Sequence, residues 1–332
     1  MNIIGIGQVS SRGRGVESFK DALEEGAVAP SLEKFSKFSE KSIPVYSIDD
    51  TLLKDKHVLS KARRADRFSK IATLAAWDAV HDGGSLESIK DESLGIIVAT
   101  AFGPHKATFN FLDNILDYGE SGVSPTIFSH SVHNAAASYI AAALDKKGPI
   151  LTITDFCFSF HQALILADSW LDQGRCKNVL VGTVDELSSA MKYICTRKLN
   201  MDDSQTVLGE GSVFFLLTKD DSKKRYCEIN QVDVSEKNIV ESTPDFYIFE
   251  NDGMINNQTA YKSFDIGRAF VFNCVPIVGG LMTASSFHCM AGAIMLKNQK
   301  NYSHPVNPIN IEKIQCVKFG CKLEKAIINL IK

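Results

Sequence analysis

The chain has 332 residues, of which 45% are hydrophobic and 23% are charged, and its formal net charge at pH 7 is −3. This composition describes a folded globular protein with a sizeable core and excludes a disordered or collagen-like chain. The small negative charge excludes the long-range positive field of a typical nucleic-acid binder, so we expect no nucleic-acid partner.

The cysteines and the N-terminus indicate where the protein resides. All eight cysteines lie in apolar stretches without a CxxC pair, which predicts free thiols in a reducing compartment. The first ten residues, MNIIGIGQVS, have neither the basic region nor the long apolar stretch of a secretory signal peptide. No later segment offers the roughly 20 consecutive apolar residues of a membrane span. We therefore expect a cytoplasmic protein without a membrane partner.

Short apolar runs alternate with amphipathic stretches along the first 220 residues. The runs have the length and the β-branched composition of buried strands, and the longer stretches repeat apolar residues every three or four positions, as helices do. This alternation predicts an α/β layered fold in which helices cover a mostly parallel sheet. The predicted strands are 2–6, 94–100, 150–154, 178–182 and 212–217, and the predicted helices are 68–81, 134–144 and 159–171.

The same plan repeats in the remainder of the chain. Residues 247–249 and 326–331 have the composition of strands. Residues 279–296 form a nearly all-apolar stretch of helical length. A helix that is apolar all round must be buried on all sides, so we expect this one at the centre of the molecule.

One segment carries candidate chemistry. Cys157 stands between the predicted strand 150–154 and the predicted helix 159–171. The dipole of a helix N-terminus favours a thiolate, which is the nucleophilic form of cysteine. Most unpaired cysteines are nevertheless buried and inert, so the position alone does not identify a nucleophile.

Several segments resemble the β-ketoacyl synthase family, and they occur in the family's order. They are the glycine-containing opening strand, the basic segment from Arg63 to Lys70, the segment around Cys157, and the two later segments Val181 to Glu186 and Leu208 to Ser212. The resemblance is continuous over residues 1–220 and weaker beyond. It places Cys157 at the family's nucleophile position. It also implies a five-layer αβαβα thiolase fold of two similar halves, residues 1–220 and a shortened half, residues 221–332.

The resemblance fails where a decarboxylating condensing enzyme needs histidines. In the family, two imidazoles stabilise the enolate that forms when a malonyl unit loses carbon dioxide. The matching positions here hold Asp252 and Leu281. A second alignment register would make His288 the second catalytic histidine, although it deletes about two helical turns. The segment from Leu281 to Phe287 is more similar to chain-length-factor-like ketosynthases, which favours an inactive condensing site.

Other residues near Cys157 have both a functional and a structural interpretation. His161 lies one helical turn after Cys157, and His133 lies in a segment similar to the chain-length-factor-like subfamily. A cysteine paired with His133, His161 or His288 would permit acyl transfer, whereas a histidine that bonds backbone groups would serve the structure alone. We also expect three neighbouring aromatic residues to contact an acyl chain: Phe156, Phe158 and Phe160.

The sequence supports neither a metal nor a cofactor. His130 and His133 are spaced like metal ligands, but no carboxylate or cysteine completes a known ligand pattern. The glycines between residues 5 and 15 form neither a GxGxxG nor a GxxxxGK[ST] motif, so a bound nucleotide has no support.

The resemblance implies partners. A chain-length-factor-like subunit pairs with a catalytic ketosynthase of fatty-acid or polyketide (polyene-type) biosynthesis, and family members dimerise through the strand that corresponds to residues 150–154. An acidic acyl carrier protein would dock on Arg63, Arg64, Arg67 and Lys70 through local charge. The alternative for these residues is a solvated face with an internal ion pair to Asp66.

Two other functions stay open. The first is an active acyltransferase or 3-oxoacyl-carrier-protein synthase that uses Cys157 as the acyl-accepting nucleophile. The second is a homodimeric acyl-binding scaffold. The segment from Lys318 to Cys321 keeps only a fragment of the family's FGFGG loop, so gating of the acyl pocket by that loop is not implied.

Overall fold

The computed structural model describes residues 1–35, 39–84, 93–198, 207–221, 226–235, 244–251, 258–302 and 310–332. Eleven strands form one mixed sheet, in which the path β12-β11-β13-β14-β10-β1-β9-β7-β5-β6 has β2 attached to β1. The strands of the first half are β1 (Asn2–Ser10), β2 (Gly13–Arg14), β5 (Leu94–Thr100), β6 (Ile150–Thr154), β7 (Asn178–Asp185) and β9 (Gly211–Thr218). Those of the second half are β10 (Glu228–Ser235), β11 (Phe246–Phe249), β12 (Phe270–Phe272), β13 (Lys313–Phe319) and β14 (Lys325–Ile331).

The two halves of the sheet meet at one point. β1 pairs with β9 along its whole length but with β10 only at its start, around the facing residues Asn2 and Glu228. A smaller sheet of β3 (Ser31–Phe35), β4 (Ser39–Tyr46) and β8 (Leu208–Gly209) lies apart from the main one.

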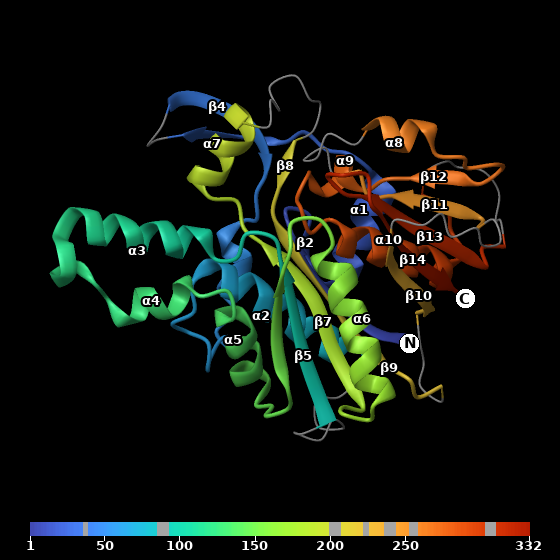
Figure 1. Ribbon diagram of the computed structural model, residues 1–332, viewed down its shortest axis with the longest axis horizontal. Coiled ribbons are helices and arrows are strands. Elements are labelled where there is room, and N and C mark those ends of the chain that lie inside the picture. Colours follow the sequence, from blue (N-terminus) through green and yellow to red (C-terminus); the bar gives the residue numbers. More distant parts are fainter. Residues whose placement is uncertain are drawn as a thin grey trace.

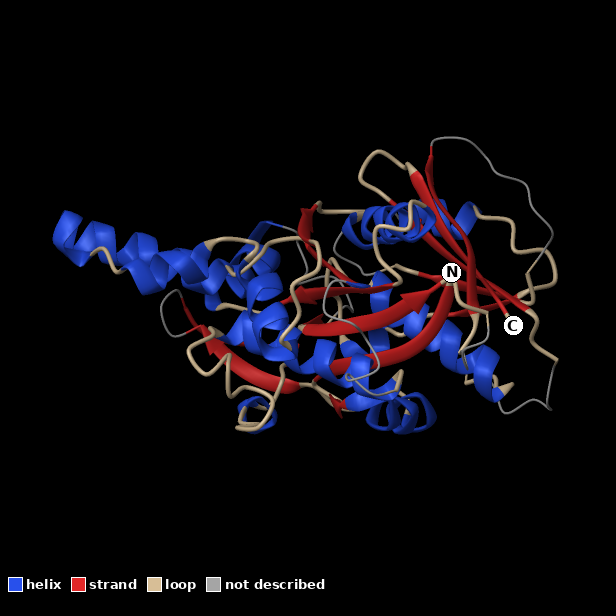
Figure 2. Ribbon diagram, turned by 90° about the horizontal axis from the view of Figure 1, so that it is seen from below, coloured by secondary structure: helices blue, strands red, loops and turns tan. Residues whose placement is uncertain are grey.

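Helices cover the sheet in layers, as Figures 1 and 2 show. The helices are α1 (Gly15–Glu25), α2 (Arg67–Asp82), α3 (His105–Tyr118), α4 (Pro125–Ser131), α5 (Ala135–Leu144), α6 (Ser159–Asp172), α7 (Ser189–Lys198), α8 (Gln258–Ser263), α9 (Val275–Val278) and α10 (Ser285–Asn298), with short 3-10 turns η1 (Asp50–Leu53) and η4 (Gly119–Gly122). None of the described helices is long and apolar enough to cross a lipid bilayer.

Successive residues of a strand point to opposite faces of the sheet, so each half-sheet can pack helices on both sides. Two half-sheets that share one helical layer give five layers. On β5, Ile96 and Val98 pack against α2 and α5, whereas Ile97 and Ala99 face α6 and α10. On the second half of the sheet, one face joins the same α6–α10 core and the other packs under α8. The order is therefore α2/α5, first half-sheet, α6/α10, second half-sheet and α8, which is the predicted αβαβα arrangement.

The expectation of a mostly parallel sheet is wrong. Only β5 with β6, β5 with β7, and β11 with its two neighbours are parallel among the described pairs of the main sheet. β9 runs antiparallel between β1 and β7, and β13 and β14 form a hairpin. A short connection can join only antiparallel neighbours, which explains the hairpin.

Two predicted elements also differ from the structure. The helix expected over 279–296 begins six residues late, at Ser285: Gly279, with a φ of 89° that only glycine adopts easily, ends the short α9, and residues 280–284 form a turn before α10. The strand β6 is not buried: it forms an edge of the sheet, and Ile150 and Leu151 are 41% and 42% exposed. The all-apolar segment of α10 is buried on every side, as its composition predicted.

Candidate functional site

Cys157 lies in the turn that connects β6 to α6. The carboxylate of Asp155 accepts hydrogen bonds from the backbone nitrogens of Cys157 and Phe158, at 2.8 and 2.5 Å. Aspartate commonly closes such turns, because its side chain reaches the backbone two residues further on. The turn presents the half-buried Cys157 two residues before α6 begins.

The thiol of Cys157 faces a second cysteine. Its Sγ atom lies 3.6 Å from Sγ of Cys321, which belongs to the hairpin between β13 and β14. Burial, together with the neighbouring thiol of Cys321, raises the pKa of Cys157 to about 11. The sulfur is therefore protonated at neutral pH and is not an activated nucleophile in this arrangement.

Four buried side chains form a polar centre between the two halves, which we define as His161, Glu250, Ser285 and Lys318. His161 Nε2 lies 3.8 Å from Glu250 Oε2, and the hydroxyl of Ser285 donates a hydrogen bond to the same oxygen. Lys318 Nζ donates to the carbonyl of Met282 at 2.8 Å and lies 3.5 Å from Ser285 Oγ. The centre therefore contains a carboxylate and an ammonium group beside one imidazole.

His161 and His288, which are 0% exposed, are neutral. Burial, with the nearby charge of Lys318, lowers the pKa of His161 to about 3. Burial likewise lowers the pKa of His288 to about 3. His288 Nδ1 lies 2.9 Å from the carbonyl oxygen of Ala284, and Nε2 lies 3.1 Å from Oδ1 of Asn273. A neutral imidazole carries one N–H, so His288 donates to one of these two oxygens, and both ring nitrogens face oxygens of the protein interior.

Of the two positions that match the family's catalytic histidines, the structure describes one. Leu281 is 3% exposed and belongs to the central apolar core. Asp252 lies outside the described residues. Glu250, two residues earlier, is the carboxylate that reaches the polar centre.

His133 lies at the surface rather than in the polar centre. Its ring packs against Gly103, where an added Cβ would stand 2.4 Å from the imidazole Cδ2. With Ile150, Leu151 and Thr152 it lines a hollow at the exposed edge of β6. The nearby His130 contacts the hydroxyl of Tyr139 at 2.9 Å.

The three phenylalanines around Cys157 have different surroundings. Phe156 is 58% exposed and packs on Phe102, with ring centroids 5.4 Å apart. Phe158 is buried beneath the β13–β14 hairpin. Phe160 is fully inside the core against Phe215, so the expectation that it contacts an acyl chain is not supported by its position.

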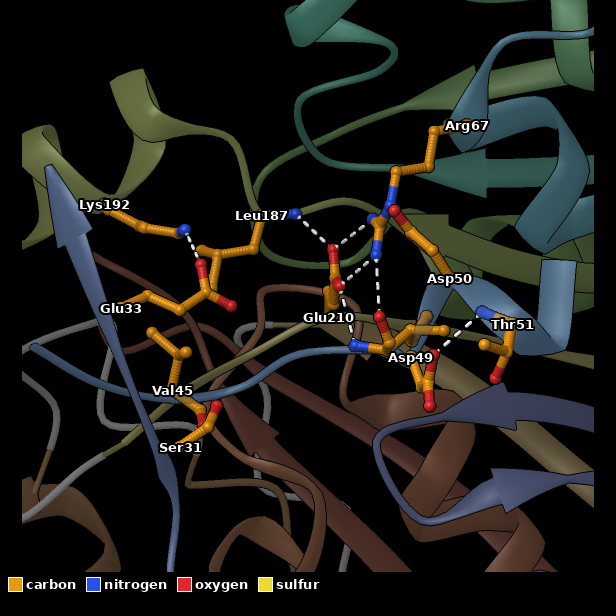
Figure 3. Close-up of polar contacts among 11 residues, drawn as sticks. Ser31, Glu33, Val45, Asp49, Asp50, Thr51, Arg67, Leu187, Lys192 and Glu210 are labelled. Carbon is orange, nitrogen blue, oxygen red and sulfur yellow. Dashed lines mark hydrogen bonds and ion pairs between the residues drawn. The ribbon is translucent and has the colours of Figure 1, made fainter. Parts of the chain in front are cut away.

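Arg67 is occupied by an internal ion pair, which Figure 3 shows. Its two terminal nitrogens each lie 2.6 Å from a carboxylate oxygen of the buried Glu210, and Nε donates to Asp50 at 2.9 Å. Glu210 also accepts hydrogen bonds from the backbone nitrogens of Ile48 and Leu187. Arg67 therefore joins η1 and α2 to Glu210, the residue between β8 and β9, and we remove it from the expected docking residues.

The ion pair expected between an arginine and Asp66 does not appear among the described contacts. Asp66 instead caps α2 by accepting a hydrogen bond from the backbone nitrogen of Ser69 at 3.3 Å. Arg63 and Arg64 are exposed and Lys70 is half-buried. Arg63 and Lys70 line a hollow of about 570 Å³ that also contains Lys54 and Lys56, and we call these four residues the basic groove.

A larger cavity of about 640 Å³ lies beside Arg67, between α2, α3 and α7. Its lining includes Arg67, Lys106, Asp113 and Lys192, but not Cys157. The Lys192 ammonium is bonded to Glu33 at its rim (Figure 3). The described residues contain no group of three His, Cys, Asp or Glu side chains that could hold a metal ion.

Sequence reasoning missed three residues of this region: Glu250, Lys318 and the position of Cys321 beside Cys157. Lys318 had a usable signal, because a lysine inside the apolar strand 313–319 must find a partner when it is buried. Glu250 and Cys321 had no signal of this kind, since their contacts come from distant parts of the chain.

Comparisons with known proteins identify the family of this chain and its fold. Residues 1–222 match the family model for the β-ketoacyl synthase, N-terminal domain. The chain is 22% identical over 240 residues to 3-oxoacyl-(acyl-carrier-protein) synthase 2 of Synechocystis sp., which covers 65% of this chain and 56% of the relative. The chain thus spans little more than half the length of the curated relatives it matches.

Two solved structures share the fold at 15% sequence identity. The ishigamide ketosynthase/chain length factor has a TM-score of 0.76 over 100% of this chain and 98% of that chain. A type II polyketide ketosynthase, solved with its acyl-carrier protein and bound to the hexaketide, has a TM-score of 0.75 over 99% and 98%. The family match over residues 1–222 and the shared architecture show that this chain belongs to the β-ketoacyl synthase family and has its thiolase fold.

Proposed function

We propose that this chain is a chain-length-factor-like subunit that pairs with a catalytic β-ketoacyl synthase in fatty-acid or polyketide (polyene-type) biosynthesis and shapes the acyl pocket. In this proposal residues 1–220 form the half that carries Cys157, and residues 221–332 form a shortened second half. The chain alone does not decarboxylate malonyl groups.

The observation that carries the proposal is the chemistry of the polar centre. Decarboxylation builds negative charge on a thioester oxygen, and hydrogen-bond donors must be aimed at that charge. Leu281 supplies none, and the single N–H of the neutral His288 ring is directed at an oxygen of the protein itself. Beside His161 stands the carboxyl group of Glu250 in place of a second imidazole, and the Lys318 ammonium of the same centre donates to the carbonyl of Met282.

The exposed edge of β6 supports pairing with a second ketosynthase-fold subunit. β6 ends the main sheet, and Ile150 and Leu151 are each about two-fifths exposed. An exposed apolar edge strand is a template for pairing with another chain. Beside it, α3 and α4 extend from the body of the molecule as an arm (Figures 1 and 2). The arm exposes large apolar side chains: Phe109, Leu112, Leu116, Tyr118 and Phe128.

The basic groove supports docking of an acidic carrier protein. Lys54, Lys56, Arg63 and Lys70 converge on one hollow that contains a single acidic residue, Asp55. Asp55 is bonded to Arg14, which reduces its effect on the positive charge of the groove. Complementary charge of this kind accelerates association and orients the partner.

The test has two parts. Acyl-carrier-protein thioesters are incubated with the wild-type chain and with Cys157→Ala, and intact mass spectrometry records any covalent acyl adduct. The tagged chain is also co-expressed with ketosynthases of the same organism, and the purified complexes are identified. The proposal expects a stable complex with a ketosynthase and no decarboxylation by the chain alone.

The other outcomes identify the competing functions. An acyl adduct that disappears in Cys157→Ala, together with release of carbon dioxide from malonyl carrier protein, would make the chain an active 3-oxoacyl synthase. A homodimer that binds acyl groups but recruits no ketosynthase would make it a scaffold. Either result overturns the proposed role.

A further inference from the structure

Two thiols from distant parts of the chain meet at the nucleophile position. Cys157 and Cys321 are separated by 164 residues in sequence, and their sulfur atoms are 3.6 Å apart. Cys321 is exposed and Cys157 is half-buried, whereas the other six cysteines are buried. This is therefore the cysteine pair that a small reagent in solution can reach.

Local contacts of a turn and a hairpin keep the two thiols side by side. Asp155 bonds the amide of Cys157, as described above. The β13–β14 hairpin is closed by a hydrogen bond of 2.8 Å from the nitrogen of Gly320 to the carbonyl of Glu324. Gly320 rests directly on the ring of Phe158, since an added Cβ would lie 2.8 Å from that ring. The hairpin tip is thus seated on the β6–α6 turn, and the seating holds Cys321 over Cys157.

We propose that Cys157 and Cys321 form a reversible disulfide that masks the nucleophile position under oxidising conditions. The inference adds a modification site to the proposed function and depends only on the position of the two sulfurs. A disulfide requires an S–S distance of about 2.05 Å, so the two sulfurs must approach by about 1.5 Å. A five-residue hairpin tip and a turn allow a movement of this size more readily than two rigid elements would.

The oxidant in the proposal is a low-molecular-weight disulfide, such as oxidised glutathione. The exposed thiolate of Cys321 attacks one sulfur of the oxidant, which releases one small thiol and leaves a mixed disulfide on Cys321. Cys157 gives up its proton to solvent, and its sulfur then attacks the Cys321 sulfur and expels the second small thiol. Two protein thiols lose two electrons and two protons, and the oxidant is reduced to two thiols.

The disulfide would have one functional consequence. A sulfur of Cys157 that is bonded to Cys321 cannot accept an acyl group or any other electrophile. Reduction by a small thiol reverses the bond and exposes the position again. The oxidation state would therefore decide whether acyl chains can reach Cys157.

The experiment uses the full chain in buffers of defined ratios of reduced to oxidised glutathione. Samples are quenched with acid, the remaining thiols are blocked with N-ethylmaleimide, and peptides are mapped without reduction. The expected result is a cross-linked peptide pair containing Cys157 and Cys321, with the loss of two hydrogens and recovery on addition of dithiothreitol. Cys321→Ser, which changes an exposed residue, should abolish the cross-link, whereas the control Cys195→Ala should retain it.

A second probe separates an oxidisable pair from two independent thiols. Phenylarsine oxide bridges two neighbouring thiols, so the wild-type chain should bind it and both Cys157→Ser and Cys321→Ser should lose that binding. Separate glutathione adducts on the two cysteines, a cross-link to another cysteine, or equal arsenical binding by wild type and variants would overturn the proposal. These readouts contain no acyl chemistry, so they can fail or succeed independently of the proposed subunit role.

Discussion

At the residue scale, the pair between Arg67 and Glu210 is a bidentate ion pair with one partner almost fully buried. Glu210 is 1% exposed, and the arginine approaches both of its carboxylate oxygens. A buried carboxylate that keeps this geometry is satisfied, whereas one that loses its partner retains the full cost of burial.

Arg67→Ala is therefore expected to lower the free energy of unfolding by about 3 kcal/mol. The matched control is Arg64→Ala, which changes an exposed arginine of the same segment and should cost less than about 0.5 kcal/mol. Urea unfolding followed by circular dichroism measures both. Equal stability of the two variants would contradict the assignment of Arg67 to the interior.

The thiol of Cys157 provides the second residue-scale prediction. Because burial raises its pKa to about 11, the thiolate fraction and the rate of alkylation by iodoacetamide should rise about tenfold per pH unit from pH 7 to pH 10. Cys321→Ala should lower the pKa, since it removes a thiol that raises it and opens the site to water. Peptide-resolved alkylation rates measure this, and a rate that levels off near pH 8 would contradict it.

The sequence located Cys157 but not its surroundings. Its place between a strand and a helix followed from local patterns, and the family resemblance added the nucleophile position. The contacts of Cys157 with Cys321 and of His161 with Glu250 join residues that are far apart in the chain. Local patterns contain no information on such pairs, and the contacts of Phe160 with Phe215 and of Arg67 with Glu210 were not predicted for the same reason.

At the element scale, three helices lie where the sequence predicts them, whereas α10 and β6 differ from the prediction. The helices α2, α5 and α6 begin and end within two residues of their predicted bounds, because their apolar periodicity is regular. The predicted start of α10 was wrong, because apolar composition does not distinguish a helix from the buried turn at Gly279. β6 was predicted as buried, since an apolar edge strand and a central strand have the same composition.

The edge position of β6 leads to the third prediction. If β6 pairs with the ketosynthase partner, Leu151→Lys should weaken the complex by about tenfold, because the one altered chain loses about 1.5 kcal/mol of apolar burial. Val271→Lys at the opposite edge of the sheet changes a residue of similar exposure and should leave the dimer intact. Light scattering after size-exclusion chromatography measures both. Equal dissociation by the two variants, or by neither, would exclude β6 as the interface.

At the scale of the whole molecule, the five layers place ionisable groups where water does not reach. The alternation of strands and helices in the sequence was sufficient to predict layers, and the family resemblance was needed to predict five of them. The layers enclose His161 and His288 between the two half-sheets. Their burial has a consequence for stability in acid.

The fourth prediction concerns that acid sensitivity. In the unfolded chain a histidine binds a proton near pH 6.5, whereas His161 and His288 do so only near pH 3 in the folded protein. The unfolded state therefore binds more protons between these values, and the free energy of unfolding falls as the pH falls through this window. At pH 5 the loss is about 2 kcal/mol for each histidine.

His288→Gln should remove its share of the acid sensitivity, so that the loss of stability between pH 7 and pH 5 becomes about 2 kcal/mol smaller. His57→Gln, which changes an exposed histidine, is the control and should leave the slope unchanged. Urea unfolding at both pH values measures the difference. An unaltered slope in His288→Gln would show that this residue is not held neutral.

The absence of decarboxylation by the chain alone is the claim on which the proposed role depends. The direct measurement is release of labelled carbon dioxide from malonyl carrier protein, with the purified chain, its Cys157→Ala variant and an active ketosynthase in parallel. We expect the chain to release no more than the Cys157→Ala variant, while the ketosynthase releases carbon dioxide readily. Release by the chain alone that is lost in His288→Ala or Cys157→Ala would contradict this account.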